Sequence, residues 1–469
     1  MTDVLFEPGS FRDRMSRVFY RRGAVYRALS PRALDDWEAL SSSQFFQRFR
    51  AEGKVIASER VEGLLPHSWK NQWAAVLKHQ LVPLISYPYE WSFSMLKDAA
   101  LLQLELLLAA LEEGITLKDA TPFNFQWIGT CPVFIDTPSF ERLTPGEPWA
   151  GYRQFCQLFL YPLFLQAYKD IPFQPWLRGA LDGINPEDCN RLMSLRDRFR
   201  PGVFAHVYLQ AKAQAKYAAT HRDIKQELHN AGFQATLIKA NAQRLHKLVQ
   251  KLSWQRLASE WSEYSENNSY NDQDQNRKEE FIRRVVRSRP WNLIWDLGCN
   301  TGTYSRIAAE NARVVVAMDA DQPAIERFYL TLKAQKQTTI LPLVNNLADP
   351  SPNLGWRGLE RKTLIERGKP DLTLCLALIH HIVITANVPL EEFIGWLAGV
   401  TQELVIEFVT RDDPMVHTLL RNKRDIYTDY QQDYFERCLE ETFTIIRREP
   451  LVSGLRCLYH ARTKLPTGL

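Results

Sequence analysis

The chain has 469 residues, of which 45% are hydrophobic and 24% charged, and its formal net charge at pH 7 is +4. This composition is that of a globular protein, and the length exceeds what one ordinary hydrophobic core supports, so we expect two or three domains. The net charge is modest for this size and by itself implies neither a nucleic acid nor a membrane as a partner.

Cysteine usage and the N-terminus indicate the compartment. Seven cysteines are scattered without a CxxC pair or a cysteine–histidine cluster of zinc-ligand spacing, so we expect no structural metal site. The N-terminus lacks the charged-then-apolar pattern of a secretory signal, and an odd cysteine count suits a reducing compartment, so we expect a cytoplasmic protein. The most apolar stretch, residues 99–111, is shorter than the roughly 20 residues that cross a bilayer. We therefore expect a buried helix there and no membrane insertion.

The first 200 residues favour a mixed α+β domain. Residues 17–29 alternate apolar and polar side chains around Arg22-Gly23, which predicts a β-hairpin. A helix is expected from Asp98 to Gly114, with the glycine as its C-terminal cap. Aromatic-rich helices are expected to follow over residues 151–168.

A basic helical segment follows, over residues 196–260, with twelve lysine or arginine residues against four aspartate or glutamate residues. This excess, together with interspersed aromatic residues, could follow the phosphates of an RNA, although long basic helices are more often solvated connectors. The next stretch, residues 265–280, is polar and predicts a loop or linker that opens a new domain.

The last region alternates apolar strands with amphipathic segments, which predicts an α/β fold with a parallel, doubly wound sheet. The expected parallel strands are residues 292–297, 313–319, 339–344, 371–378 and 403–409. Two closing strands, residues 443–449 and 456–463, are joined through Ser453-Gly454, which predicts a terminal hairpin.

The strongest chemical signal is IWDLGCNTGTYS, residues 294–305. Here an apolar strand ends at Asp296 and turns through Gly298 and Gly302 into a helix, which brings backbone N–H groups to the carboxyl edge of the sheet. The next strand ends in Asp319, at a spacing where an acid can accept hydrogen bonds from both hydroxyls of a ribose.

With the polar stretch NNLAD after the third strand, this set resembles the class I S-adenosylmethionine-dependent methyltransferases over about residues 261–469. The resemblance also accounts for the terminal hairpin, since that family ends with an antiparallel seventh strand. It implies a cofactor site formed by Asp296, Gly298, Cys299, Asn300, Gly302, Asp319, Asn346 and Asp349. Asn300 replaces the family's central glycine, a tolerable change because asparagine adopts positive φ more readily than most residues.

Within this site the resemblance implies that Asp296, Gly298 and Gly302 surround the methionine part of the cofactor and that Asp319 binds the ribose. Asn346 and Asp349 are candidates for the adenine amino group, although asparagine and aspartate also form turns.

Two alternatives for the domain as a whole are a nicotinamide dehydrogenase, which usually shows G-x-G-x-x-G rather than the G-x-x-x-G found here, and a sheet that binds nothing. Upstream, Tyr270 and Lys278 are candidates to close over the cofactor, and solvation is the favoured role for Lys278.

Methyl transfer requires an acceptor nucleophile aligned with the sulfonium methyl, and in some cases a base. Candidates at the ends of the fourth and fifth parallel strands are His380, His381, Glu407, Asp412 and Asp413. We expect one histidine of the pair to point into the crevice and the other to be packed. A neutral histidine could deprotonate a hydroxyl near pH 7, whereas an amine acceptor needs no strong base.

The N-terminal half carries a second spacing, in which Asp119 is followed by Asn124 and then by Asp136 at the end of an apolar run. This resembles protein-kinase-like and aminoglycoside-phosphotransferase-like domains over roughly residues 10–200 and implies a nucleotide and metal site holding Mg-ATP. The sequence departs from that pattern at Lys118 and at Thr137-Pro138, and no glycine-rich loop precedes it. Lys54 is only a candidate for the usual strand lysine, and the three polar residues could instead form turns and caps.

A bacterial group of two-part methyltransferases, which includes nodulation host-specificity proteins, is similar to this chain in several segments. These are NLADPSPNLGWRGLERKTLIERGKPD, IHHIVI and EFVTRDDP, with ISYPYEWS and YRQF in the N-terminal half. We therefore predict a kinase-like domain over residues 1–200, a connector over 201–260 and a methyltransferase domain over 261–469. The predicted reaction moves a methyl group from S-adenosyl-L-methionine to an O or N atom of a small molecule or glycan. Alternatives are an RNA methyltransferase and a bifunctional protein with a phosphotransferase domain.

Overall fold

The computed structural model describes residues 4–62, 64, 72–218, 235–255, 272–421, 423–424 and 426–464. The chain forms two compact units: unit 1 comprises Met1–Gln255 with Leu354–Arg361, and unit 2 comprises Arg256–Asn353 with Lys362–Leu469. The domain boundaries predicted at residues 200 and 260 stay predictions. Tyr270, one of the two residues expected to close over the cofactor, lies outside the described residues.

Unit 1 begins with an antiparallel sheet of five strands in the order β1-β2-β3-β5-β4. Its strands are Leu5–Phe6 (β1), Ser16–Arg21 (β2), Ala24–Leu29 (β3), Ser58–Val61 (β4) and Ala75–His79 (β5). The predicted hairpin joins β2 to β3, and its two turn residues, Arg22 and Gly23, both adopt positive φ, at 50° and 73°. Between β3 and β4 the chain forms helices α1 (Pro31–Ser42) and α2 (Gln44–Ala51).

The rest of unit 1 is built around the long helix α3 (Phe93–Glu112), which confirms the helix predicted from Asp98 and begins five residues earlier. Gly114, just after its end, has a φ of 71°, as expected of a glycine cap. Two short antiparallel pairs follow, β6 (Ile115–Leu117) with β9 (Phe140–Arg142) and β7 (Phe125–Ile128) with β8 (Cys131–Phe134). The later helices are α4 (Tyr152–Phe155), α5 (Tyr161–Lys169), α6 (Gln174–Gly179), α7 (Pro186–Leu192), α8 (Leu209–Ala218) and α10 (Ala235–Lys251).

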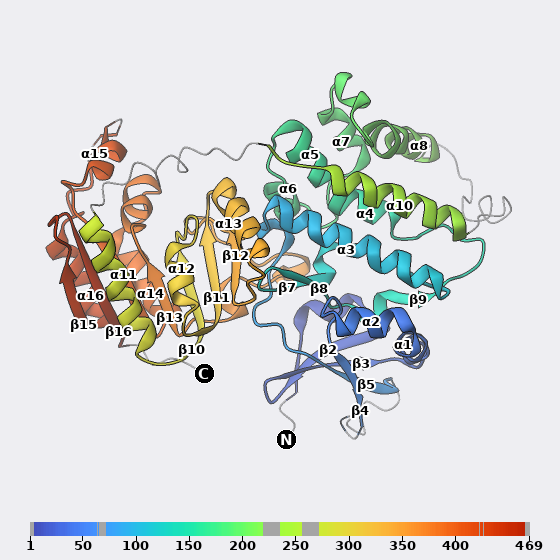
Figure 1. Cartoon of the computed structure of the whole chain (residues 1–469), viewed down its shortest axis with the longest axis horizontal. Coiled ribbons are helices and arrows are strands. Elements are labelled where there is room, and N and C mark those ends of the chain that lie inside the picture. Colours follow the sequence, from blue (N-terminus) through green and yellow to red (C-terminus); the bar gives the residue numbers. More distant parts are fainter. Residues whose placement is uncertain are drawn as a thin grey trace. The chain divides into compact units, whose positions relative to one another are not determined.

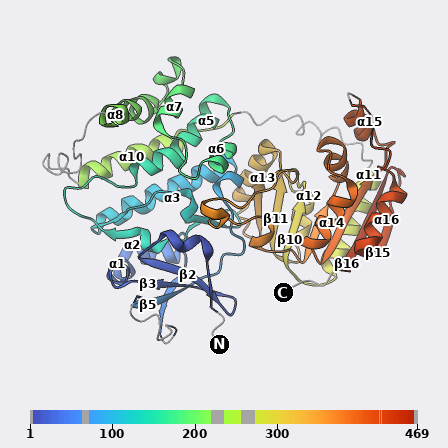
Figure 2. The same ribbon diagram turned by 180° about the vertical axis from the view of Figure 1, so that it is seen from behind.

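Helices α3 and α10 run side by side in unit 1 (Figure 1, and from behind in Figure 2). Helix α10 is the second described α-helix of the basic segment, and it buries Ile238, Ala242, Leu245 and Val249. The Lys97 ammonium of α3 also donates to the Leu252 carbonyl, 2.8 Å away, just beyond the end of α10. This part of the basic segment therefore packs into unit 1.

Unit 2 contains a sheet of seven strands in the order β12-β11-β10-β13-β14-β16-β15. The first five are parallel: Trp291–Leu297 (β10), Ala312–Asp319 (β11), Ile340–Val344 (β12), Leu372–Cys375 (β13) and Glu403–Val409 (β14). The closing hairpin of Phe443–Pro450 (β15) and Arg456–Thr463 (β16) inserts β16 antiparallel between β14 and β15. This order, with its antiparallel seventh strand, confirms the predicted α/β methyltransferase fold.

The described part of unit 2 includes the α-helices α11 (Asp272–Arg287), α12 (Thr303–Ala308), α13 (Gln322–Ala334), α14 (Leu390–Val400), α15 (Pro414–Leu420) and α16 (Gln432–Thr442). The central strands are mostly apolar on both sides because helices cover both faces of a parallel sheet. Every residue of β14, for example, is buried, as are Phe281 of α11 and Phe328 of α13 in the core.

The linker predicted over residues 265–280 is wrong for its described part, because α11 begins at Asp272. Two acids, Asp272 and Asp274, lie in the first turn, where their negative charges stabilise the helix by interacting with the positive end of its dipole. Asp274 is also buried, and its carboxylate accepts the backbone N–H of Val452 at 2.6 Å in the β15–β16 turn. Tertiary contacts therefore extend the helix into a stretch whose composition suggests a loop.

Within the described part of the chain, no helix combines the length and the apolar character needed to cross a bilayer. Helix α3, with 20 residues, includes Lys97, Asp98 and Glu105.

Candidate functional site

Unit 2 has a cavity of about 510 Å³ at the carboxyl ends of its parallel strands. This is within the roughly 300–1,000 Å³ typical of small-molecule sites, and it lies at the edge where open α/β sheets bind ligands. Of the predicted cofactor residues, those that line it are Gly298, Cys299, Asn300, Asp319 and Asn346. The residues that lie elsewhere are Asp296, Gly302 and Asp349.

The turn after β10 has the backbone that its glycines predict. Gly298, Asn300 and Gly302 all have positive φ, at 73°, 49° and 81°. The N–H groups of Gly298 and Cys299 donate to the carbonyl of Met318 on the neighbouring β11, at 2.8 and 3.0 Å. The main chain of the turn therefore forms part of the cavity wall and is fixed to the second strand of the site.

Asp319 links the two strands. Its Oδ2 accepts the backbone N–H of Asn300 at 2.8 Å and its Oδ1 accepts that of Asp321 at 2.9 Å. Burial raises the pKa of Asp319 while these backbone donors act to lower it. The carboxylate lines the cavity in a fixed orientation, which is the arrangement needed to accept hydrogen bonds from a ligand diol.

Gly302 is close to the core rather than to the cavity. A Cβ atom built on it would lie 1.9 Å from Cζ of Phe328 on α13, far inside contact distance. The glycine therefore allows the start of α12 to approach the ring of Phe328.

Asp296 lies under the turn, with 1% of its surface exposed. Its Oδ2 accepts the Ser305 hydroxyl at 2.5 Å, and its Oδ1 has no partner within the described part of the chain. Burial raises the pKa of Asp296 from its ordinary value of 3.8 to about 6. A carboxyl group in this position supports the turn from below.

We expect Asp296→Asn to change how the stability of unit 2 depends on pH. Between about pH 4 and pH 6 the folded state keeps a proton on Asp296 that the unfolded state has released, so stability falls as pH rises through this window. The amide does not titrate, so the free energy of unfolding of the variant, relative to that of wild type, should rise by roughly 2–3 kcal/mol from the lower to the upper end of this pH window. Denaturant unfolding of both proteins at about pH 4 and pH 6 measures this change. If the difference in stability between the two proteins is the same at both pH values, the raised pKa of Asp296 is contradicted.

The segment after β12 supplies two asparagines. Asn346, a predicted adenine contact, lines the cavity, whereas Asp349 is exposed. Asn345, which was not among the predicted site residues, is 5% exposed and also lines the cavity, and its Oδ1 lacks a partner among the described residues. The Oδ1 atom of Asn300 is likewise buried without a described partner. Two buried acceptors at one cavity fit a ligand that donates hydrogen bonds, as the amino group and hydroxyls of adenosine do.

The predicted catalytic residues have different surroundings. His381 lines the cavity, whereas His380 is 1% exposed and packs with its ring 4.2 Å from that of His381. Burial lowers the pKa of His381 to about 4 and lowers that of His380 as well, so both rings are neutral near pH 7. Glu407 is fully buried and forms ion pairs with Lys278 and Arg456.

Asp412 is exposed and Asp413 is fully buried, and neither lines the cavity. A catalytic role for any of these residues stays a prediction. The solvation favoured for Lys278 is wrong, because its side chain is 2% exposed and lines the cavity.

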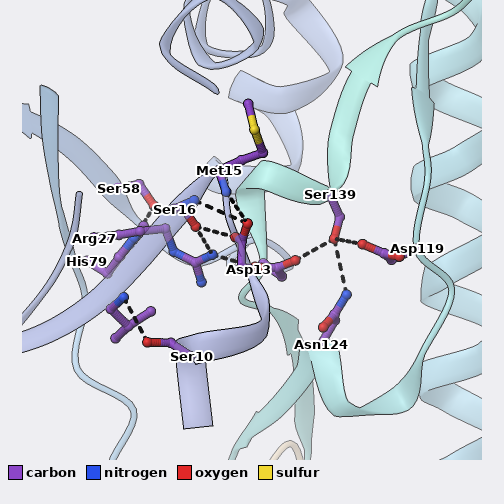
Figure 3. A network of polar contacts seen from close by, with 12 residues as sticks. Ser10, Asp13, Met15, Ser16, Arg27, Ser58, His79, Asp119, Asn124 and Ser139 are labelled. Carbon is purple, nitrogen blue, oxygen red and sulfur yellow. Dashed lines mark hydrogen bonds and ion pairs between the residues drawn. The ribbon is translucent and has the colours of Figure 1, made fainter. Parts of the chain in front are cut away.

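A second polar cluster lies in unit 1 and brings together the three residues of the kinase-like spacing. Figure 3 shows Ser139 joined to Asp119 and Asn124. The Ser139 hydroxyl lies 2.5 Å from Asp136 Oδ2, 3.4 Å from Asp119 Oδ2 and 3.2 Å from the amide nitrogen of Asn124. Arg27 of β3 donates to Asp136 Oδ1 at 2.6 Å. Although burial acts to raise the pKa of Asp136, Arg27 and Ser139 hold it below its ordinary value.

This arrangement does not fit a metal ion without rearrangement, because Arg27 and Ser139 engage both carboxylate oxygens of Asp136. Over the described ranges, no group of three or more histidine, cysteine, aspartate or glutamate side chains is placed to hold a metal ion. Lys54 forms ion pairs with Glu52 and with Glu105 of α3, at 3.1 and 3.4 Å. The kinase-like interpretation and Mg-ATP binding stay predictions.

Comparison with solved structures finds similarity to methyltransferases over less than half of this chain. The N-methyltransferase NodS from Bradyrhizobium japonicum WM9 is 12% identical with a TM-score of 0.30, over 41% of this chain and 98% of NodS. Magnesium protoporphyrin IX methyltransferase (ChlM) from Synechocystis PCC 6803 is 17% identical with a TM-score of 0.31, over 44% of this chain and 92% of ChlM. Because these identities and TM-scores are low, the fold of unit 2 is assigned from its strand order and not from the similarity to these structures.

Comparison of sequences extends over both units. No family model matches the chain. The nodulation protein NoeA of Rhizobium meliloti (strain 1021) is 33% identical over 465 residues, which cover 96% of this chain and 94% of NoeA. Because one residue in three is identical across nearly the whole length of both proteins, the chain belongs to the family of the nodulation protein NoeA.

Proposed function

We propose that unit 2 binds S-adenosyl-L-methionine and transfers its methyl group to an O or N atom of a small molecule or glycan. The observation that carries this proposal is the cavity at the carboxyl edge of the sheet, where Asp319 is fixed by backbone N–H groups of the glycine turn. The strand order supports it, as do the buried acceptors of Asn300 and Asn345, which have no partner in the described part of the chain.

Methyl transfer requires little catalytic assistance from side chains, because the sulfonium already activates the methyl group when the cofactor is bound. The side chains at the cavity then hold the acceptor in line and exclude water. His381 is neutral and can hydrogen-bond an acceptor, but its pKa of about 4 makes it a weak base. An acceptor whose lone pair is already available, such as an amine, requires the least from these residues.

Calorimetric titration of the full chain with S-adenosyl-L-methionine tests the proposal. We expect wild type to bind and Asp319→Asn to bind roughly 10- to 100-fold more weakly, because hydrogen bonds to a charged group contribute about 1.5–3 kcal/mol. Asp429→Ala, which changes an exposed acid of the same unit, is the matched control and should bind as wild type does. A folded wild-type chain that does not bind the cofactor would disprove the proposal.

The acceptor is best identified by following a labelled methyl group into the metabolites of a cell extract. An RNA acceptor and nucleotide binding by unit 1 stay predictions. RNA retention that weakens between low and moderate salt would support the former, since phosphate contacts release counterions. Titration of wild type and Asp136→Asn with Mg-ATP tests the latter, and equal binding by both proteins would exclude a metal role for Asp136.

A further inference from the structure

The polar cluster of unit 1 is filled at its centre by a side chain of the protein. A divalent ion shared by Asp119, Asn124 and Asp136 would lie between them, about 2.0–2.1 Å from each ligand atom for Mg²⁺. The hydroxyl of Ser139, a fully buried residue, already lies within 3.4 Å of all three side chains. An ion and this hydroxyl therefore compete for the same space.

The hydrogen bonds at this centre are those of a hydroxyl and not those of a metal ion. A serine hydroxyl has one proton, which Ser139 donates to Asp136 at 2.5 Å. The same oxygen accepts the amide N–H of Asn124 at 3.2 Å. Asn124 thus presents its nitrogen to the centre, whereas a magnesium ligand would have to present the amide oxygen.

The positive charge beside Asp136 also comes from the protein. The guanidinium of Arg27 lies 2.6 Å from Oδ1 of Asp136, and the Arg27 side chain is 10% exposed. The Ser16 hydroxyl, on the neighbouring strand β2, accepts a hydrogen bond from the same nitrogen at 3.2 Å and donates one to Asp13 at 2.5 Å (Figure 3). Asp13 is fixed in turn by the backbone N–H groups of Met15 and Ser16. The guanidinium is therefore held against Asp136 from both strands.

A divalent ion would have to displace both of these groups. Moving Arg27 away from Asp136 would leave a largely buried guanidinium without its carboxylate, which is strongly unfavourable. Moving Ser139 would break a short hydrogen bond to an ionised acid, one of the stronger kinds. Arginine also stays charged at all ordinary pH values, and as part of β3 it does not dissociate from the cluster.

We propose that unit 1 supplies with its own side chains what a divalent ion supplies in kinase-like domains: Ser139 fills the space and Arg27 provides the charge. The cluster then holds no metal ion and transfers no phosphate, and it joins β3 to the segments that follow β6 and β8. This excludes the alternative of a bifunctional protein with a phosphotransferase domain. The inference depends on the kinase-like resemblance of unit 1 and is independent of the function proposed for unit 2.

Electron paramagnetic resonance of Mn²⁺, which takes the same oxygen ligands as Mg²⁺, counts the ions bound to the full chain. We expect wild type and Asp136→Asn to give the same titration, because no ion contacts Asp136 in either protein. A bound Mn²⁺ that wild type holds and Asp136→Asn loses would overturn the proposal.

A nucleotide can bring an ion with its phosphates, so ATP is titrated calorimetrically with and without Mg²⁺. The effect of Mg²⁺ on any ATP affinity should agree within about twofold between wild type and Asp136→Asn. An affinity that Mg²⁺ increases in wild type alone would also overturn the proposal.

The reverse experiment removes both substitutes for the ion. We expect Arg27→Met combined with Ser139→Ala to gain about one Mn²⁺ per chain, because Asp119 and Asp136 then lie near each other without the guanidinium and the hydroxyl. Adding Asp136→Asn should remove the gained ion. Arg60→Met, at an exposed arginine of β4, is the control and should gain none. A folded double variant that gains no ion would overturn the roles of Arg27 and Ser139.

Arg27→Lys separates the charge from the rest of the side chain. We expect this variant to gain no Mn²⁺, and a gain equal to that of the double variant would show that the charge does not exclude the ion. If the double variant does not fold, the comparison of wild type with Asp136→Asn still decides whether the native cluster holds an ion.

Discussion

Replacing Gly302 by alanine should destabilise unit 2 by about 2–4 kcal/mol and weaken binding of the proposed cofactor. The new Cβ would lie 1.9 Å from Cζ of Phe328 and 2.3 Å from both Cε atoms, and φ is 81° at this position. Phe328 is 1% exposed within the core of unit 2, so its ring cannot swing into solvent. Either α12 or α13 must shift, and the glycine turn shifts with α12. Hydrogen exchange of peptides from β10 to β14 measures the stability of this unit within the full chain.

Gly454 offers a matched control, since its φ is 70° and a Cβ there meets nothing within 4 Å. Gly454→Ala should therefore show the backbone strain alone, about 1 kcal/mol. In addition, Gly302→Ala combined with Phe328→Ala should cost less than the two single changes together, because the clash needs both side chains. Similar losses in the two glycine variants, or additive losses in the pair, would show that contact with Phe328 is not the cause.

The sequence predicted the parts of unit 2 that local pattern determines. Apolar runs bounded by turn residues mark β10 to β14, because strands buried on both faces are predominantly apolar. The carboxyl ends of parallel strands lie at one edge, so Gly298 and Asp319, which follow two such strands, meet at one cavity. Asn300 adopts the positive φ expected of the residue that replaces the family's central glycine.

Local sequence pattern does not predict contacts between residues that are far apart along the chain. Lys278 lies in a charged stretch that suggests solvation, and only the packing of α11 brings it to Glu407, 129 residues later. In unit 1 the spacing of Asp119, Asn124 and Asp136 is visible in the sequence, but the pairing of Asp136 with Arg27 depends on the fold, since 109 residues separate them.

The sequence also does not predict the direction in which side chains point near the end of a strand. Asn345 and Asn346 both follow β12 directly, and the two residues have different surroundings: Asn345 is buried and Asn346 is exposed. Composition alone cannot show which residue of such a pair is enclosed, because neighbouring side chains leave an extended backbone in opposite directions.

Arg456→Met should cost unit 2 about 3–5 kcal/mol, the usual penalty for removing one member of a buried charge network. Arg456 is 3% exposed and contacts Glu407 at 3.4 Å and Asp413 at 2.9 Å, and both acids are fully buried. Without the guanidinium, Asp413 loses its ion pair in a low-dielectric interior and Glu407 keeps only the ammonium of Lys278. Hydrogen exchange of peptides from β14 and β16 measures this loss of stability.

The neighbouring strand provides the comparison for this prediction. Arg447 on β15 pairs with Glu449 at 2.6 Å, but its side chain is 40% exposed. Arg447→Met should therefore cost no more than about 1 kcal/mol, because water already solvates both partners. If the two variants lose the same stability, burial of the network is not what makes Arg456 important. If Arg456→Met instead keeps wild-type stability, the two acids are not both charged, and the network could not hold Lys278 in its charged form at the cavity.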